Sequence, residues 1–433
     1  MSFRKIGSNL LTVALLAVGL GAWVVLPWYG VVALAAALGA WLFLSRQGKL
    51  ALAAAGVGIA SLPRRWGASS VIVIGIAGVV GVLVAMLAMG EGFQATLKGT
   101  GSDEAAIILR GGSQVETNSV ISRNQAPLIV GLPGIARSAD GRPLASPEVS
   151  QVVNLPSKAD GTDANVQMRG VGDEGWEVRP HMRLVQGRRF ERGLREIVVG
   201  QGVSAQYRGV EVGKTLRLGN EDWTVVGVFA SGDSHDSEMW TDAQTLASFY
   251  RRPAYQSVTV RLDGKDGFAQ LKAALDDDPR LKLDALTTSD YYTRQSSGTT
   301  TLIRVLGTVI GAIMAIGAVF GALNTMYAAV ATRAREIATL RAIGFRGLPV
   351  VVAVMLETML LALLGGLIAW VVFNGYSVST MSSNFSQVVF QFKVTPELLW
   401  TGLKWALGIG LVGGLFPALR AARLPITAAL REV

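Results

Sequence analysis

The sequence predicts an α-helical membrane protein with six spans and an α+β extracytoplasmic domain inserted after the third span. Half of the 433 residues are apolar and only 16% are charged, and the mean hydropathy is +0.41. This balance is too apolar for an ordinary soluble domain. Positions 91–300, in contrast, have the composition of a soluble protein. The apolar runs lie at 10–44, 71–89, 302–331, 348–373 and 398–416.

The charged residues follow the same division. Positions 91–300 hold 24 basic and 27 acidic residues, whereas the rest of the chain holds 16 basic and 4 acidic ones. Those basic residues lie in short clusters beside apolar runs, which is typical of membrane topology and not of a nucleic-acid-binding face. We therefore expect no nucleic-acid partner. The absence of cysteine excludes disulfides, thiolate metal sites and cysteine nucleophiles.

The spans are predicted from length, since a bilayer core needs roughly 20 apolar residues per helix. The charge-free stretch Leu10–Leu44 is too long for one span and is interrupted at Pro27, so we interpret it as a helical hairpin. A cleaved signal peptide is the alternative. The shorter apolar segment Leu50–Leu62 predicts an elbow helix at the membrane surface. The other spans are expected at 67–89, 301–330, 348–373 and 398–419.

Basic clusters predict the orientation of these spans. They lie at residues 4–5, 46–49, 64–65, 333–346 and 420–431. If the arginine-rich loop 333–346 is cytoplasmic, all five clusters fall on one side of the membrane, as the positive-inside rule requires. Both termini are then cytoplasmic. The expected domains are an N-terminal transmembrane hairpin (1–49), an elbow helix with the first core span (50–90), an extracytoplasmic domain (91–300), and a three-span membrane domain with a cytoplasmic helix (301–433).

The insert predicts a mixed α+β domain without a recognisable catalytic face. Its strands are expected at 106–110, 195–200, 215–219, 222–229 and 255–262, where β-branched or alternating apolar residues are bounded by turn formers. Helical spacing is found at 242–252 and 266–278. The last polar segment between spans, 374–396, is interpreted as a short loop.

Several segments of the insert resemble ligand sites. The string GVEVGKT at 209–215 imitates a phosphate-binding loop but has three residues between its glycines instead of four, so a β-turn is expected. His181 and His235, the only histidines, are separated by 53 residues and lack metal-ligand spacing. His235 lies in GDSHDSE, for which a solvated acidic loop is favoured and cation binding is the alternative. The acidic run 276–278 is interpreted as a solvated helix end.

No nucleophile motif such as G-x-S-x-G organises the serines of the insert. We therefore expect a non-catalytic chain, with no catalytic, cofactor-binding or metal-binding residue.

The loop 332–347 predicts a short amphipathic helix between two spans. Ile337, Leu340 and Ile343 share one helical face, and the charged side chains point elsewhere. Periodicity alone is equally compatible with a positive-inside anchor and with a helix that docks a partner.

The order of residues in this loop resembles a known signature. RAREIATLRAIGF at 333–345, which follows an apolar span and Asn324, is similar to the signature of the MacB/FtsX-like ABC transporter permeases. Other similar segments are EIVVG at 196–200, LRLG at 216–219, WTVVGVF at 223–229, LLALLGGLIA at 360–369 and FPALRAARLPITAALRE at 416–432. The resemblance covers about Leu50 to Val433. The N-terminal hairpin departs from it, because the usual permease has four spans.

The resemblance implies a MacB-type periplasmic core domain and an FtsX-like membrane domain in a bacterial inner membrane. No Walker motif is present, so the ATPase, with its ATP and magnesium, is implied on a separate cytoplasmic subunit. The helix that would dock into this subunit comprises Arg335, Glu336, Ile337, Leu340, Arg341, Ile343, Gly344 and Phe345. The apolar members would make apolar contacts and the charged ones polar contacts. The expected partners also include membrane lipids, a second permease copy or homologue and a candidate periplasmic adaptor.

Two features of the spans complete the expectations. Two G-x-x-x-G pairs in one span, Gly307 with Gly311 and Gly317 with Gly321, are candidate dimer contacts. Glu357 is an intramembrane acid, expected to face protein or to pair with an arginine.

The resemblance also implies a function. The permease would export or extract a lipoprotein, peptide or hydrophobic compound by mechanotransmission, in which ATP hydrolysis on the partner moves the extracytoplasmic domain. The alternative is an ATP-driven signalling or regulatory complex that acts on a cell-envelope enzyme or in antibiotic sensing. A solitary receptor without an ATPase is a further alternative.

Overall fold

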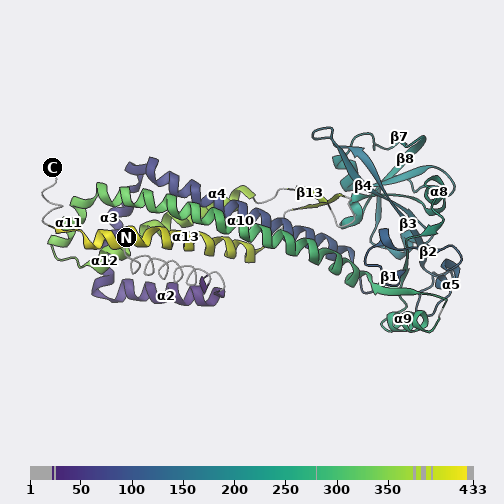
Figure 1. Cartoon of the computed structure of the whole chain (residues 1–433), viewed down its shortest axis with the longest axis horizontal. Helices are drawn as coiled ribbons and strands as arrows, with labels where there is room; N and C mark the ends of the chain where they lie inside the picture. The colour runs from purple at the N-terminus through teal and green to yellow at the C-terminus, as the bar shows by residue number, and fades with distance from the viewer. Residues whose placement is uncertain are drawn as a thin grey trace, which may run out of the picture. The chain divides into compact units, whose positions relative to one another are not determined.

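The computed structural model describes residues 22–23, 26–278, 280–373, 377–381, 387–391 and 394–426. The chain forms two compact units, which we call the helical unit and the sheet domain (Figure 1). The helical unit comprises Met1–Ala88, Ile303–Gly375 and Val394–Val433. The sheet domain comprises Met89–Leu302 and Tyr376–Lys393.

Long apolar helices and two short ones, η1 and α11, build the helical unit. They are α2 (Trp28–Leu44), α3 (Arg46–Ala60), η1 (Leu62–Arg65), α4 (Trp66–Thr100), α10 (Thr288–Thr332), α11 (Ala334–Ala342), α12 (Gly347–Phe373) and α13 (Pro396–Arg423). The helices α4 and α10 each have residues in both units and carry no break at the boundary.

The number of spans differs from the expectation. Among the described residues, α4, α10, α12 and α13 are long and apolar enough to cross a bilayer. The helices α2 and α3 meet at an angle of 95° and would add a fifth span if this bent pair counts as one. The first of the six expected spans lies mostly outside the described residues, so neither six spans nor an insertion after the third is confirmed. The expected elbow segment belongs to α3 and η1.

Small residues let the membrane helices approach closely. A Cβ atom on Gly410 of α13 would lie 2.7 Å from the Cβ of Ala362 on α12, and one on Gly365 of α12 would lie 2.8 Å from the backbone oxygen of Val73 on α4. Such contacts replace the hydrophobic effect, which is weak between helices in lipid. The same unit holds a buried lysine on α13, Lys404, whose Nζ donates to the oxygen of Leu26 at 3.2 Å.

The sheet domain contains a ten-stranded mixed sheet in the order β12-β1-β11-β3-β4-β9-β6-β8-β5, with β7 paired to β8. The strands are β1 (Ala105–Arg110), β3 (Ala145–Pro156), β4 (Asp163–Val171), β5 (Arg183–Gly187), β6 (Glu196–Gly200), β7 (Thr215–Leu218), β8 (Glu221–Ala230), β9 (Glu238–Asp242), β11 (Ser257–Arg261) and β12 (Leu283–Thr287). Two short strands, β2 (Ile121–Ser122) and β10 (Ala254–Tyr255), pair separately.

Short helices complete the domain: η2 (Glu116–Asn118), α5 (Ala126–Val130), α6 (Gly175–Val178), α7 (Gln201–Gln206), η3 (Ser234–Ser237), α8 (Ala243–Phe249) and α9 (Gly267–Asp277). Several apolar clusters stabilise the sheet, and two of them are large. One gathers β3, β4, β6, β8 and β9 around Trp223 and Leu246, and the other gathers β1, β11 and β12 around Ile108 and Leu271.

The ends of the two long helices are joined at one edge of the sheet. The helix α4 ends four residues before β1, and α10 begins directly after β12. The strands β1 and β12 are antiparallel neighbours, with Ala106 opposite Thr287. Next to them, Ser102 donates its backbone N–H to Oγ1 of Thr288 at 2.9 Å, and this hydroxyl donates to the oxygen of Ser102 at 2.9 Å. The β1–β12 ladder and the Ser102–Thr288 bonds therefore both hold the ends of α4 and α10 together.

The strands and helices expected in the second half of the insert are confirmed as β6, β7, β8, β11, α8 and α9. GVEVGKT forms a turn in which Gly209 and Gly213 have φ values of +78° and +86°, as expected for a β-turn. The interpretation of 374–396 as a short loop is wrong, because β13 (Ser377–Met381) and β14 (Gln387–Gln391) pair there as antiparallel strands.

Candidate functional site

A buried ionic cluster lies within the sheet domain. Arg169 on β4 donates to both carboxylate oxygens of Glu238 at 2.8 and 2.9 Å and to both of Glu116 at 2.8 and 3.0 Å. It also bonds Glu148 on β3 at 2.8 Å, and Glu148 in turn accepts from Arg179 at 2.7 Å. All five side chains are buried. The cluster therefore joins η2, β3, β4 and β9 by charge-assisted bonds, the strongest hydrogen bonds available to side chains.

The cluster makes stability depend on pH. Burial alone would raise the pKa of Glu148, but the Arg179 and Arg169 guanidinium groups lower this pKa from 4.5 to about 2. A carboxyl whose pKa is lowered by folding stabilises the fold above its unfolded pKa. This contribution is lost as the pH falls from 4.5 towards 2.

We expect the free energy of unfolding to fall by about 3 kcal/mol across this interval because of Glu148, at ~1.4 kcal/mol per unit of pKa. Urea unfolding of the full chain in detergent, repeated at several pH values, measures this slope. Glu148→Gln should lose its share of the slope, whereas Glu177→Gln, at an exposed carboxyl, should keep it. Equal slopes in wild type and Glu148→Gln would contradict the assignment.

The two histidines of the chain meet in the sheet domain, although their spacing in the sequence is unlike that of a local metal motif. Nε2 of His181 lies 2.9 Å from Oδ2 of Asp233, and Nδ1 of His235 lies 2.9 Å from Oδ1 of the same carboxylate. Asp233 and His235 are buried. Burial alone would raise the pKa of Asp233, but the His235 charge and the hydrogen bonds it accepts hold the pKa well below its usual range.

The expected solvated acidic loop is therefore wrong. Besides Asp233 and His235, Glu238 belongs to the ionic cluster, and Asp236 accepts backbone N–H bonds from Ser231 and Gly232 at 2.7 and 3.0 Å. The loop is a folded turn whose polar groups point inward. The acidic run 276–278 behaves closer to expectation, since Asp278 follows the end of α9 and pairs with the exposed Arg280.

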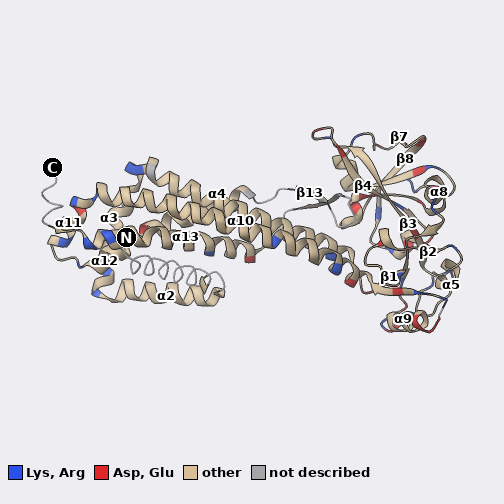
Figure 2. Ribbon diagram, in the orientation of Figure 1, with Lys and Arg blue, Asp and Glu red and all other residues tan. Residues whose placement is uncertain are grey.

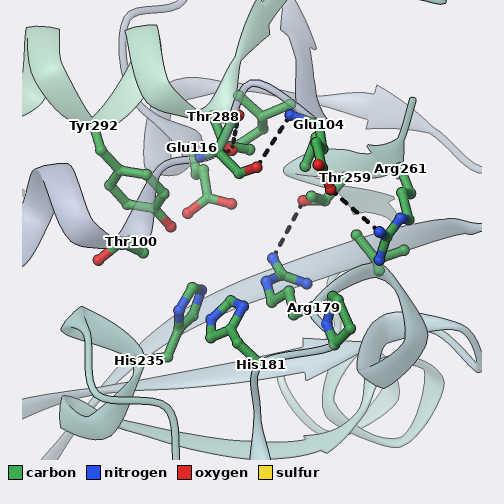
Figure 3. Close-up of a pocket in the computed structure, with 15 residues that line it drawn as sticks. Thr100, Glu104, Glu116, Arg179, His181, His235, Thr259, Arg261, Thr288 and Tyr292 are labelled. Atoms are coloured by element: carbon green, nitrogen blue, oxygen red, sulfur yellow. Dashed lines mark hydrogen bonds and ion pairs between the residues drawn. The ribbon is translucent and has the colours of Figure 1, made fainter. Parts of the chain in front are cut away.

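A cavity of about 150 Å³ lies beside the histidines. Figure 3 shows the imidazoles of His181 and His235 side by side, with Tyr292, Thr100 and Glu116 on the opposite wall. Residues from the ends of α4 and α10 thus line the same cavity as the loops that hold the histidines.

The arginine-rich helix α11 lies in the helical unit, at the end where Lys and Arg residues gather (Figure 2). Its apolar face is turned towards the chain itself. Ile337 is buried, which corrects its expected role as a partner contact. Leu340 and Phe345 are half-buried and pack against the cluster of Ala54, Ala55 and Ala353 from α3 and α12, so their contact with a partner stays an expectation.

The outward face of α11 is charged, with one apolar residue at its end. Arg335 and Glu336 are exposed, and Ile343 is 71% exposed. Gly344 ends the helix at φ +107°. Its N–H bonds the oxygen of Arg341, and the N–H of Phe345 bonds that of Leu340, which is the Schellman motif. Glycine is required here because other residues are strained at this φ, and the motif fixes where Ile343 projects.

Ion pairs hold the start of α11 in place. Glu357 on α12 is buried and accepts from Arg65 at 3.1 Å and from Arg333 at 3.0 Å. Arg333 precedes α11 and also bonds Glu336 at 3.0 Å. At the other end, Nη1 of Arg341 donates to the oxygen of Leu424. These contacts fasten α11 to α12, η1 and the end of α13.

The two glycine pairs on α10 have different surroundings. Cβ atoms on Gly307 and Gly311 would meet Met86 and Leu83 of α4 at 2.9 and 2.8 Å, whereas Gly317 and Gly321 face open space. The first pair thus permits close packing inside one chain, which corrects its assignment to an interface between copies. Only the second pair is left as a candidate for such an interface.

Comparisons with known families agree with the division of the chain into a sheet domain and a helical unit. Residues 69–278 match the MacB-like periplasmic core domain, and residues 308–426 match the FtsX-like permease C-terminal domain. The chain belongs to the MacB/FtsX-like permease family. Its apolar helices and this family make it an inner-membrane protein. The N-terminal residues before position 69 lie outside both matches.

Curated relatives of this permease are longer. It is 28% identical over 393 residues to the macrolide export ATP-binding/permease protein MacB of Chromobacterium violaceum, covering 83% of this chain and 57% of that protein. It is 26% identical to MacB of Photorhabdus laumondii, covering 66% of this chain and 46% of that protein. The permease thus spans about half the length of these relatives.

Among solved structures, the periplasmic region of MacB from Actinobacillus actinomycetemcomitans is 14% identical and aligns with a TM-score of 0.35, covering 45% of this chain and 93% of that one. The extracellular domain of the transporter YknZ from Gram-positive bacteria is 16% identical with a TM-score of 0.32, covering 42% of this chain and 100% of that one.

The sequence analysis did not predict the ionic cluster. Its signal was weak, because single charged residues such as Arg169 in QMRGV interrupt segments that are otherwise apolar.

Proposed function

We propose that this permease is the transmembrane subunit of an ABC exporter and that α11 is its coupling helix. ATP and magnesium would bind a separate cytoplasmic ATPase subunit, whose movement reaches the sheet domain through α4 and α10. The observation that carries this proposal is the fixed geometry of α11, which turns Arg335, Glu336 and Ile343 outward while both of its ends are fastened to other helices.

The contact surface for the ATPase is accordingly charged with one apolar anchor. Ile343 is the exposed apolar residue at the end of α11, beside this charged surface, and apolar anchors surrounded by polar contacts dominate interface energies. Behind it, Ile337 packs in the core of the membrane helices, and Leu340 and Phe345 pack against Ala54, Ala55 and Ala353 of α3 and α12. A force on the exposed face would then pass into α3 and α12 instead of bending α11.

The length of the flanking helices supports mechanotransmission. The 45 residues of α10 extend over about 68 Å at 1.5 Å per residue, roughly twice the hydrocarbon thickness of a bilayer. An unbroken helix has no hinge at which a displacement is lost. The basic residues around α11 support a cytoplasmic position for this end and for both termini, with the sheet domain outside.

The charged residues within the spans support a cargo that does not pass through them. Glu357 is paired with arginines and Lys404 with a backbone oxygen, so neither offers a free charge to a polar solute. We therefore propose work on a lipoprotein, peptide or hydrophobic compound outside the spans. A second copy could pack on Gly317 and Gly321, which face open space, and a periplasmic adaptor would bind the sheet domain.

Ile343→Asp tests the proposal in the complex that copurifies with the full chain. We expect the affinity for the ATPase subunit to fall roughly tenfold or more, because an interface anchor is worth about 2 kcal/mol, and substrate-stimulated ATP hydrolysis to be lost. Val120→Asp makes the same change at an exposed position of the sheet domain and should leave both unchanged. Normal coupling in Ile343→Asp would refute the assignment of α11.

A regulatory machine would use the same parts without moving cargo. It shares the dependence on α11, so Ile343→Asp does not separate the two functions. Purified complex in proteoliposomes does, because ATP-dependent release of cargo is expected only of an exporter.

A further inference from the structure

We propose that the sheet domain binds a divalent zinc ion through His181, Asp233 and His235. This site goes beyond the transport function and does not depend on it. One ligand atom from each of these three residues lies within 4.8 Å of the other two. Zinc binds imidazole nitrogen and carboxylate oxygen at about 2.0–2.2 Å, so a small closure of the three side chains brings all of them into its coordination sphere.

The elements that carry the ligands are held in place by the fold. Asp233 caps η3 by accepting the N–H of His235 at 2.9 Å, which fixes the spacing of these two ligands. The same turn is anchored to the end of α4, where Oγ1 of Thr100 accepts the N–H of Ser234 at 3.0 Å. His181 arrives from the segment between α6 and β5, and its side chain is 46% exposed. A cation can therefore enter past His181 without unfolding the loop.

Hydrogen bonding alone leaves the cluster incomplete. Nε2 of His235 is buried and has no hydrogen-bond partner in the part of the chain that the structure describes. A buried polar atom without a partner costs about 1–3 kcal/mol. The ring of His235 lines the cavity, and its other nitrogen, Nδ1, is the one that faces Asp233 at 2.9 Å.

The chemistry of the ligands favours zinc over magnesium or calcium. Two imidazoles and one carboxylate suit a borderline-soft ion, whereas magnesium and calcium prefer sets of six or more oxygen ligands. Three protein ligands also leave the fourth tetrahedral position open, as in zinc sites that bind water or a substrate group. The cavity of about 150 Å³ beside the histidines has room for that fourth ligand.

Zinc titration of the full chain in detergent, after removal of any affinity tag, tests the site. We expect one zinc ion per chain by calorimetry and by elemental analysis after dialysis, and an upward shift of the unfolding temperature with zinc. Cobalt should bind in the same place and give the visible absorption of a tetrahedral complex. Millimolar magnesium or calcium should not displace either ion.

His181→Ala is the decisive variant, because its half-exposed side chain can be removed without opening the core. We expect zinc affinity to fall about tenfold or more, as for the loss of residues that support a metal site, beyond the small loss of zinc-free stability that comes from removing the hydrogen bond to Asp233. Asp233→Asn should weaken binding similarly. Glu104→Gln, at an exposed residue of the same cavity, is the control and should bind as wild type does. Absence of saturable zinc binding, or equal affinity in wild type and His181→Ala, would overturn the proposal.

Discussion

Arg169→Met is expected to destabilise the sheet domain by about 3–5 kcal/mol, the range for removing one partner of a buried ion pair. Arg169 neutralises Glu116, Glu148 and Glu238, and its loss leaves these buried carboxylates with only Arg179 as a counter-charge among the cluster. Thermal unfolding of the full chain measures the loss, and hydrogen exchange in β4 locates it.

The matched control is Arg142→Met. Arg142 pairs with Glu174 at 3.0 Å but is half exposed, and exposed ion pairs contribute only about 0–1 kcal/mol. Adding Glu116→Gln, Glu148→Gln and Glu238→Gln to Arg169→Met should recover part of the stability, because the uncompensated charges are then gone. Equal stability of the two single arginine variants would show that the cluster does not stabilise the sheet domain.

Glu357→Leu is expected to cost about 3 kcal/mol, the low end for a buried pair that loses one partner, because Arg65 and Arg333 retain some exposure. The two arginines are left close together, with only the exposed Glu336 still paired to Arg333. Since Arg333 precedes α11, we also expect faster hydrogen exchange in α11 and weaker coupling to the ATPase subunit.

Glu336→Leu is the control for Glu357→Leu. Glu336 bonds the same Arg333 but is 58% exposed, so its loss should alter stability by about 0.5 kcal/mol or less. Glu357→Gln keeps one of the two acceptor oxygens that Glu357 offers to the arginines and should lie between the two. If Glu357→Leu left hydrogen exchange in α11 unchanged, the ion pairs would have no part in positioning that helix.

The membrane helices and part of the sheet could be predicted because their patterns are local. Unbroken apolar runs predict α4, α10, α12 and α13, and runs of β-branched residues predict β6 and β8. The strands β3 and β4 were not foreseen, because polar side chains interrupt their sequences. Those polar residues are buried as well, since Arg169 pairs with Glu148, so the usual alternation of apolar and polar positions was absent.

The candidate sites show the same limit. Periodicity grouped Ile337, Leu340 and Ile343 on one helical face, but it does not reveal whether that face meets a partner or the chain itself. The glycine spacing on α10 predicted close packing without naming the neighbour, which is α4 for Gly311. The spacing of His181 and His235 in the sequence did not predict that they meet. Spacing rules describe local motifs, whereas the fold brings together residues that are distant in sequence.

The corner where α4 and α10 enter the sheet domain restricts the kind of displacement that these helices can deliver. Sliding one helix along the other would shear the ladder from Ala106 and Thr287 to Arg110 and Leu283. A slip of one residue would turn the buried Ile108 away from its core, because neighbouring strand positions face opposite sides. The β1–β12 ladder therefore opposes any movement of α4 relative to α10. Only a push, tilt or rotation that both helices make together is transmitted to the other strands.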